Sequence, residues 1–186
     1  MIPYGTFTFF LIAFIVLIPV IILGFLGKRS YIYNGISTAI MIVIIFASDK
    51  HNLLGQKYLS AQLFCFIIYV IWQVALIMYY YQSRQKKNTF TKFVTIMVLS
   101  ILPLAIVKIL QSSWLGGHQI HFHESKLIEF VGFLGISYVT FKSVQLIMEI
   151  RDGSIKEIKV GKLIQFISFF PTISSGPIDR YKRFVK

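Results

Sequence analysis

Two charged side chains lie inside an otherwise apolar stretch of the chain. Glu129 and Lys142 interrupt the run from Leu127 to Met148. Because a charge in an apolar environment is costly, such residues are candidates for function. Each also has a structural explanation: Glu129 lies near the start of the stretch, and the long Lys142 side chain can reach toward a polar surface. A surface position is favoured for Glu129, and both interpretations of Lys142 stay open.

Further polar side chains surround Lys142. They are Ser137, Thr140, Ser143 and Gln145. In a helix, Ser137 and Thr140 are about 60° apart around the axis and one turn apart along it. These side chains could bond to neighbouring helices or line a hydrated passage. We take Thr140, Lys142 and Gln145 as candidates for such a passage.

A cluster of turn-forming residues interrupts the apolar run from Leu163 to Ile178. The cluster is Ser174, Ser175, Gly176 and Pro177, and Pro171 precedes it. Non-helical backbone at membrane depth persists only where protein or a polar cavity covers it. The four residues are therefore further passage candidates, and a purely structural re-entrant turn is the alternative.

Local motifs assign no catalytic residue and no metal site. The four histidines, with Glu124 beside the last of them, all fall in predicted loops: His51, His118, His121 and His123. Their spacing matches no known metal site, so a solvated loop is the favoured interpretation. The sequence contains no catalytic triad order, nucleotide-binding glycine loop or zinc-protease motif. The single cysteine, Cys65, allows no internal disulfide.

The elements that must position these residues follow from composition. Of 186 residues, 56% are hydrophobic and 14% charged, which excludes a soluble domain and a disordered chain. The net charge of +12 lies in short clusters between apolar runs, so nucleic-acid binding is not expected. A bilayer core needs about 20 apolar residues per helix. We expect an all-α, polytopic membrane protein with one membrane domain, spans near 6–26, 30–48, 58–83, 93–113 and 127–148, a re-entrant segment at 163–178 and a basic tail at 179–186.

Orientation follows from the lysines and arginines of the loops. With the amino terminus outside, the inner loops hold ten of these residues and the outer loops four. The tail adds four more, at Arg180, Lys182, Arg183 and Lys186. The bias is fourteen to four if residues 163–178 dip into the membrane and return, and ten to eight if they cross it. The sequence thus predicts a multi-pass protein of the cell membrane, with its amino terminus outside and its tail inside.

Two blocks resemble the membrane-bound O-acyltransferase (MBOAT) family. They are GISYVTFKSVQLIMEIRDG at 135–153 and FFPTISSGPIDR at 169–180. The resemblance implies the front part of a helical ring and, for the closest branch, transfer of D-alanine to lipoteichoic acid in Gram-positive bacteria. The implied donor is a phosphopantetheine thioester on a D-alanyl carrier protein, with no cofactor bound. The family's catalytic histidine belongs to a later portion and none of the four histidines matches it, so we expect a fragment that is inactive alone.

The resemblance also implies partners. They are the carrier protein, other membrane proteins of the lipoteichoic acid pathway and anionic lipid. Arg180, Lys182 and Arg183 are candidates for contact with the carrier or with lipid. Two other classes of function stay open, half of a transporter or channel and a non-catalytic membrane scaffold.

Overall fold

The computed structural model describes residues 7–26, 31–47, 57–86, 89–111, 135–155, 157–169 and 180–185. All regular elements in these ranges are helices: α1 (Phe7–Phe25), α2 (Tyr31–Ala47), α3 (Lys57–Lys86), α4 (Phe90–Gln111), α6 (Ile136–Arg151), α7 (Val160–Ser168) and α9 (Tyr181–Val185). The expected all-α fold is therefore confirmed for the described part of the chain.

The first four helices follow the apolar runs of the sequence. Each begins and ends within three residues of the predicted span. Helix α6 continues to Arg151, past the predicted end at Met148, and α7 ends at Ser168 within the segment predicted to be re-entrant. Whether these helices cross a membrane stays a prediction. Two of the described helical stretches are long and apolar enough to do so, Leu63–Lys86 and Phe90–Ile109, and α1 and α2 contain shorter apolar stretches.

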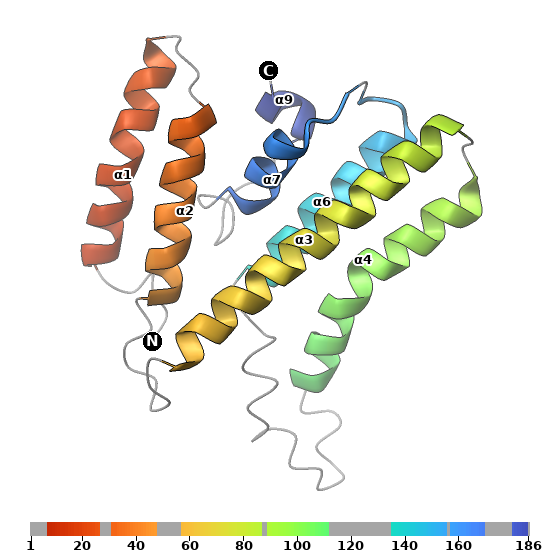
Figure 1. Cartoon of the computed structure of the whole chain (residues 1–186), viewed down its shortest axis with the longest axis horizontal. Coiled ribbons are helices and arrows are strands. Elements are labelled where there is room, and N and C mark those ends of the chain that lie inside the picture. Colours follow the sequence, from red (N-terminus) through yellow and green to blue (C-terminus); the bar gives the residue numbers. More distant parts are fainter. Residues whose placement is uncertain are drawn as a thin grey trace, which may run out of the picture. The chain divides into compact units, whose positions relative to one another are not determined.

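The chain divides into two compact units, Met1–Leu63 and Phe64–Lys186. In the first unit, α1 and α2 pack against each other (Figure 1). Helix α1 exposes a stripe of large apolar side chains along one side, to which Phe14, Ile15 and Ile18 belong. Pro19 lies inside α1 without ending it, which membrane helices tolerate more readily than helices in water.

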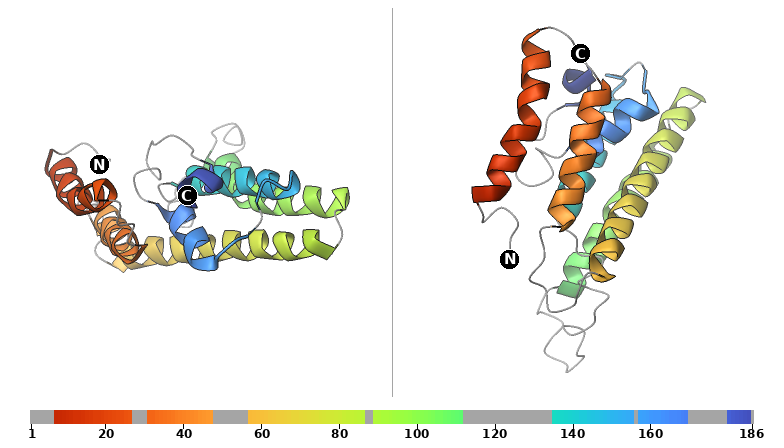
Figure 2. Two further views of the ribbon diagram at one scale, coloured as in Figure 1. Left: turned by 90° about the horizontal axis from the view of Figure 1, so that it is seen from above. Right: turned by 60° about the vertical axis from the view of Figure 1, so that its left-hand side comes forward.

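The second unit combines most of α3 with α4, α6, α7 and α9. Helix α6 packs closely against α4, α7 packs against α6, and α9 packs against α7. Side-chain hydrogen bonds join α3 to both α4 and α6. Figure 2 shows α4 and α6 side by side, with α7 and α9 near the carboxyl-terminal end of the chain. Four buried polar residues of this unit form hydrogen bonds between helices: Gln73, Ser100, Thr140 and Lys142.

The end of α6 is set by a glycine. Gly153 adopts a φ of 74°, a left-handed conformation that costs glycine little. The Gly153 N–H bonds to the Ile150 carbonyl, and the Ser154 N–H bonds to the Glu149 carbonyl, both at 3.1 Å. This pair of bonds is a Schellman motif, which satisfies carbonyls that the helix leaves without partners. It stops α6 where Arg151 meets the end of α3.

Candidate functional site

A buried row of polar side chains joins α3, α4 and α6. Gln73 on α3 donates from Nε2 to the Tyr69 hydroxyl at 2.8 Å and to the Ser100 carbonyl at 3.0 Å. The Ser100 hydroxyl on α4 donates back to Gln73 Oε1 at 2.7 Å. The Tyr69 hydroxyl meets Thr140 Oγ1 of α6 at 2.6 Å. Gln73, Ser100 and Thr140 are fully buried, so the row is a polar interior feature of the second unit.

The hydrogen bonds in this row run in one direction. Thr140 donates its hydroxyl proton to the Ile136 carbonyl at 2.7 Å. Because a hydroxyl has one proton to donate, Thr140 accepts from Tyr69, and Tyr69 in turn accepts from Gln73. Both amide hydrogens of Gln73 are then engaged, as is its oxygen. A buried polar row that is satisfied in this way stabilises the contact of three helices.

Lys142 follows Thr140 by two residues on α6, on the side that faces α7, and is 2% exposed. Its Nζ donates to the Phe166 carbonyl at 3.1 Å and lies 3.5 Å from the Ile167 carbonyl. These carbonyls belong to the last turn of α7, where a helix lacks internal donors and carries partial negative charge. The Lys142 ammonium therefore caps α7 inside the protein. It does not extend to an exposed surface, as the snorkelling interpretation required.

The same helix end carries a cluster of aromatic rings. The Lys142 ammonium lies 5.6 Å from the centre of the Phe166 ring. Phe166 makes edge contacts with Tyr181 and Phe184 of α9, at 5.4 and 5.5 Å between ring centres. Lys142, α7 and the basic helix α9 thus form one continuous set of contacts.

The remaining predicted site residues divide into described and undescribed positions. Gln145 is half-buried and donates to Glu149 Oε1 at 3.3 Å, while its own Oε1 is buried without a partner among the described residues. The three basic residues of the tail, Arg180, Lys182 and Arg183, are exposed on or beside α9. The three candidates on α6 therefore have separate partners: Thr140 bonds to Tyr69 of α3, Lys142 to the end of α7, and Gln145 to Glu149 of α6 itself.

Several sequence predictions lie outside the described residues. They concern the passage candidates Ser174, Ser175, Gly176 and Pro177, the charge at Glu129, and the loop residues His51, His118, His121, His123 and Glu124. Among the described positions, no group of three or more metal-ligating side chains comes together.

Sequence reasoning missed the other three residues of the row to which Thr140 belongs. Gln73, Tyr69 and Ser100 carry no charge, so a search for charged residues in apolar stretches passes over them. Gln73 did leave a signal, because a glutamine in the middle of a long apolar run needs hydrogen-bond partners inside the protein. Which helices supply those partners is information that only the structure contains.

Comparisons with known proteins align almost the entire chain with three curated relatives. All three are teichoic acid D-alanyltransferases. The protein of Bacillus subtilis (strain 168) is 46% identical over 100% of this chain and 44% of its own length, and that of Lacticaseibacillus rhamnosus is 41% identical over 99% of this chain and 41% of its own length. The protein of Streptococcus thermophilus is 33% identical over 98% of this chain and 39% of its own length. The chain thus spans about two fifths of the length of these relatives. No protein family model matches it.

The described part of the chain is all-helical, and its apolar helices together with these relatives indicate a membrane protein. The chain is homologous to the teichoic acid D-alanyltransferases. The resemblance to that branch of membrane acyltransferases, noted at residues 135–153 and 169–180, is thereby confirmed.

Proposed function

We propose that this chain forms part of a membrane acyltransferase that transfers D-alanine to teichoic acid, specifically lipoteichoic acid. The observation that carries the proposal is alignment along nearly the whole chain with three D-alanyltransferases at 33–46% identity. The donor is a D-alanyl thioester on the phosphopantetheine arm of a carrier protein. The acceptor hydroxyl attacks the thioester carbonyl, a C–O bond forms, the C–S bond breaks, and the hydroxyl proton passes to a general base.

This chain supplies part of the path for the aminoacyl group and no catalytic residue. A D-alanyl group carries an ammonium and cannot enter hydrocarbon without polar partners. Thr140, Lys142 and Gln145 border that path, together with the backbone of residues 174–177. The polar side chains that α6 carries inside the protein, and the buried Gln145 oxygen without a described partner, support this role. The general base is a histidine of the longer protein, beyond residue 186.

The topology that suits this reaction has five spans, with the amino terminus outside and a re-entrant segment at 163–178. It places Lys186 and the basic tail inside, where a soluble carrier protein docks. The charge bias of fourteen to four supports it. Reporter fusions after Lys92, Lys126, Lys162 and Lys186 are expected to read inside, outside, inside and inside. An outside signal at Lys186 would show that residues 163–178 cross the membrane.

A chimera tests the function directly. Residues 1–186 replace the aligned part of the Bacillus subtilis relative in a strain that lacks its own D-alanyltransferase. We expect the chimera to restore D-alanine esters on the wall polymers, measured after mild alkaline release. Residues 1–186 alone are expected to restore none, because none of their four histidines matches the one that the family uses as general base, whose contribution is about 10² to 10⁴-fold in rate.

Two controls make the result decisive. The intact relative must restore the esters, and membrane fractions must contain equal amounts of relative and chimera. A chimera that is present and correctly inserted but yields no ester would contradict the proposal. Full ester content with residues 1–186 alone would contradict the assignment of the general base to another part of the protein.

A further inference from the structure

Two arginines meet at the turn that ends α6. Arg84, on the last turn of α3, donates from Nε to the Arg151 carbonyl at 3.1 Å. Its Nη2 lies 3.1 Å from the position that a Cβ at residue 153 would occupy. The absence of a side chain at Gly153 thus lets the Arg84 guanidinium lie against the backbone of the Schellman turn. The contact fixes the guanidinium at the junction of α3 and α6.

The second guanidinium is held by aromatic rings. The Arg151 guanidinium carbon lies 4.3 Å from the centre of the Phe93 ring and 5.5 Å from that of Phe90, both on α4. Stacking on a ring orients a guanidinium and leaves its N–H groups free to donate. Among the described residues, neither Arg84 nor Arg151 forms an ion pair. Two orientated cations therefore lie at one helix junction with no carboxylate bonded to either.

A buried hydroxyl completes the group. Tyr80 on α3 is 2% exposed, and its ring lies 6.1 Å from that of Phe93. Its hydroxyl has no hydrogen-bond partner among the described residues. Tyr80 lies one turn before Arg84 on the same face of α3, and both the Tyr80 ring and the Arg151 guanidinium lie against the Phe93 ring. A buried hydroxyl without a partner is uncommon and calls for an explanation.

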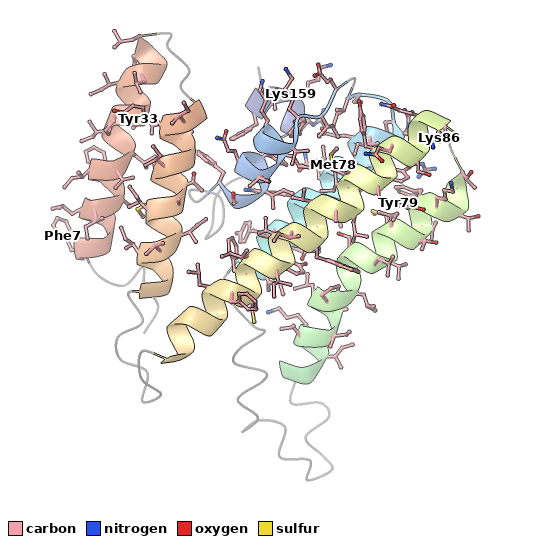
Figure 3. The ribbon with its side chains drawn as sticks, in the orientation of Figure 1. Phe7, Tyr33, Met78, Tyr79, Lys86 and Lys159 are labelled. Carbon is pink, nitrogen blue, oxygen red and sulfur yellow. The ribbon has the colours of Figure 1, made fainter. Side chains whose placement is uncertain are left out.

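The charges and apolar side chains around Arg84, Arg151 and Tyr80 indicate which chemical class of ligand could bind there. Lys86 and Lys92 add two exposed positive charges at the same helix ends, and Asp152 adds one negative charge. Exposed apolar side chains adjoin them, with Tyr79 59% and Phe90 66% exposed. Figure 3 shows Tyr79 and Lys86 toward the same end of α3. An anion with an apolar body fits this combination better than a free ion does.

We propose that Arg84, Arg151 and Tyr80 form a site for the phosphate group of an anionic phospholipid. Arginine N–H groups match phosphate oxygens in geometry and charge, and basic pockets between membrane helices bind lipid headgroups. The Tyr80 hydroxyl donates to the same phosphate, and the acyl chains lie along the exposed apolar surface beside Phe90. The site is separate from the row at Thr140 and independent of the proposed acyl transfer.

Binding of a short-chain phosphatidylglycerol to the 186-residue chain in neutral detergent tests the site, with native mass spectrometry as the measurement. Arg151→Gln is expected to weaken binding about tenfold or more, since it removes charge-assisted hydrogen bonds. Tyr80→Phe keeps the ring and is expected to weaken binding about threefold to tenfold. The controls, Lys86→Gln and Tyr79→Phe, are expected to stay within about twofold of the original chain.

Circular dichroism and elution volume must match for all variants. If Arg151→Gln fails to fold, Tyr80→Phe against Tyr79→Phe still decides the question. Equal losses in Arg151→Gln and Lys86→Gln would overturn the site and leave only a general attraction of the basic surface. Displacement of the lipid by inorganic phosphate at equal concentration would overturn the assignment to a lipid. Unchanged binding in both Arg151→Gln and Tyr80→Phe would overturn the proposal outright.

Discussion

The two units of the molecule use their interiors differently. In the first unit, the hydrogen bond of the buried Ser37 side chain is local, to the Asn34 carbonyl one turn earlier. In the second unit, Gln73 and Tyr69 bond to residues on other helices, and Lys142 bonds to the carbonyl end of α7. Apolar packing alone tolerates many substitutions of similar size, whereas paired polar groups tolerate few. The second unit is therefore where the sequence specifies particular partners, and we place the chemistry there.

The largest effect is expected for Lys142→Met in the chimera. The change removes the donor that holds the end of α7 beside α6, and a misplacement of about 1 Å can cost about 10²-fold in rate. Stability is expected to fall by about 1–3 kcal/mol, because the Phe166 carbonyl loses its buried donor. D-alanine ester content and the amount of protein in the membrane give the two readouts. Lys159→Met is the matched control, since Lys159 is exposed at the start of α7 (Figure 3).

A chimera with Lys142→Met that transfers D-alanine at the original rate would make Lys142 a structural residue. Lost transfer together with lost protein would lead to the same conclusion. Lost transfer at normal protein level is the outcome that strengthens the contrast between the units.

Gln73→Leu tests the polar row itself. The change leaves the Ser100 hydroxyl and the Tyr69 hydroxyl each without one partner, at a cost of about 1–3 kcal/mol per buried group. Detergent unfolding of the 186-residue chain, followed by circular dichroism, measures the loss. Ile71→Leu on the exposed face of α3 is the control and is expected to change the free energy of unfolding by less than about 0.5 kcal/mol. Equal effects of the two changes would remove the distinction between paired and apolar faces.

Replacing one glycine by alanine in each unit compares how strongly the backbone is constrained in the two units. Gly153→Ala forces a side chain into a left-handed conformation and against Arg84, so we expect a loss of about 1–2 kcal/mol. Gly24→Ala lies in α1 with nothing within 4 Å of the added carbon, and we expect a gain of up to about 1 kcal/mol from helix propensity. The same unfolding measurement reports both. A gain at both positions would mean that the turn after Arg151 does not constrain the second unit.

The smallest effect is expected for the basic tail. Replacing Arg180, Lys182 and Arg183 together by Gln is expected to slow transfer from a loaded carrier protein by about tenfold or less, and less at high salt, because the charges act on encounter. Membrane vesicles that contain the chimera provide the assay. The control replaces Lys28 and Arg29 of the first unit. A salt-independent loss, or an equal loss in the control, would leave the tail only an orientation or lipid-binding role.

The helices were predictable from the sequence where the length of an apolar run alone determines them. The candidate site was predictable only in part. The runs that became α1 to α3 lack interior charges, and the run that became α4 has a single one, Lys108, near its end, so their length located the helices. The extension of α6 to Arg151 was missed because Glu149 and Arg151 ended the apolar run, although Gly153 signals a helix end. Thr140 and Lys142 stood out as polar residues in an apolar stretch. The partner of Lys142 could not be predicted, because it is a backbone carbonyl, which every residue has.

The row from Ser100 to Thr140 also fixes the register of three helices. Apolar helices in a bilayer can slide past one another at little cost, since lipid and leucine are alike to them. A slide of one turn, about 5.4 Å along α3, would move Ile77 to the level of Ser100 and break the bonds of Gln73. A buried polar residue at one position is known to set the alignment of paired helices. The hydrogen bonds of this row thus fix the positions of α3, α4 and α6 along their axes. They thereby also set the depth at which Lys142 on α6 bonds to the end of α7.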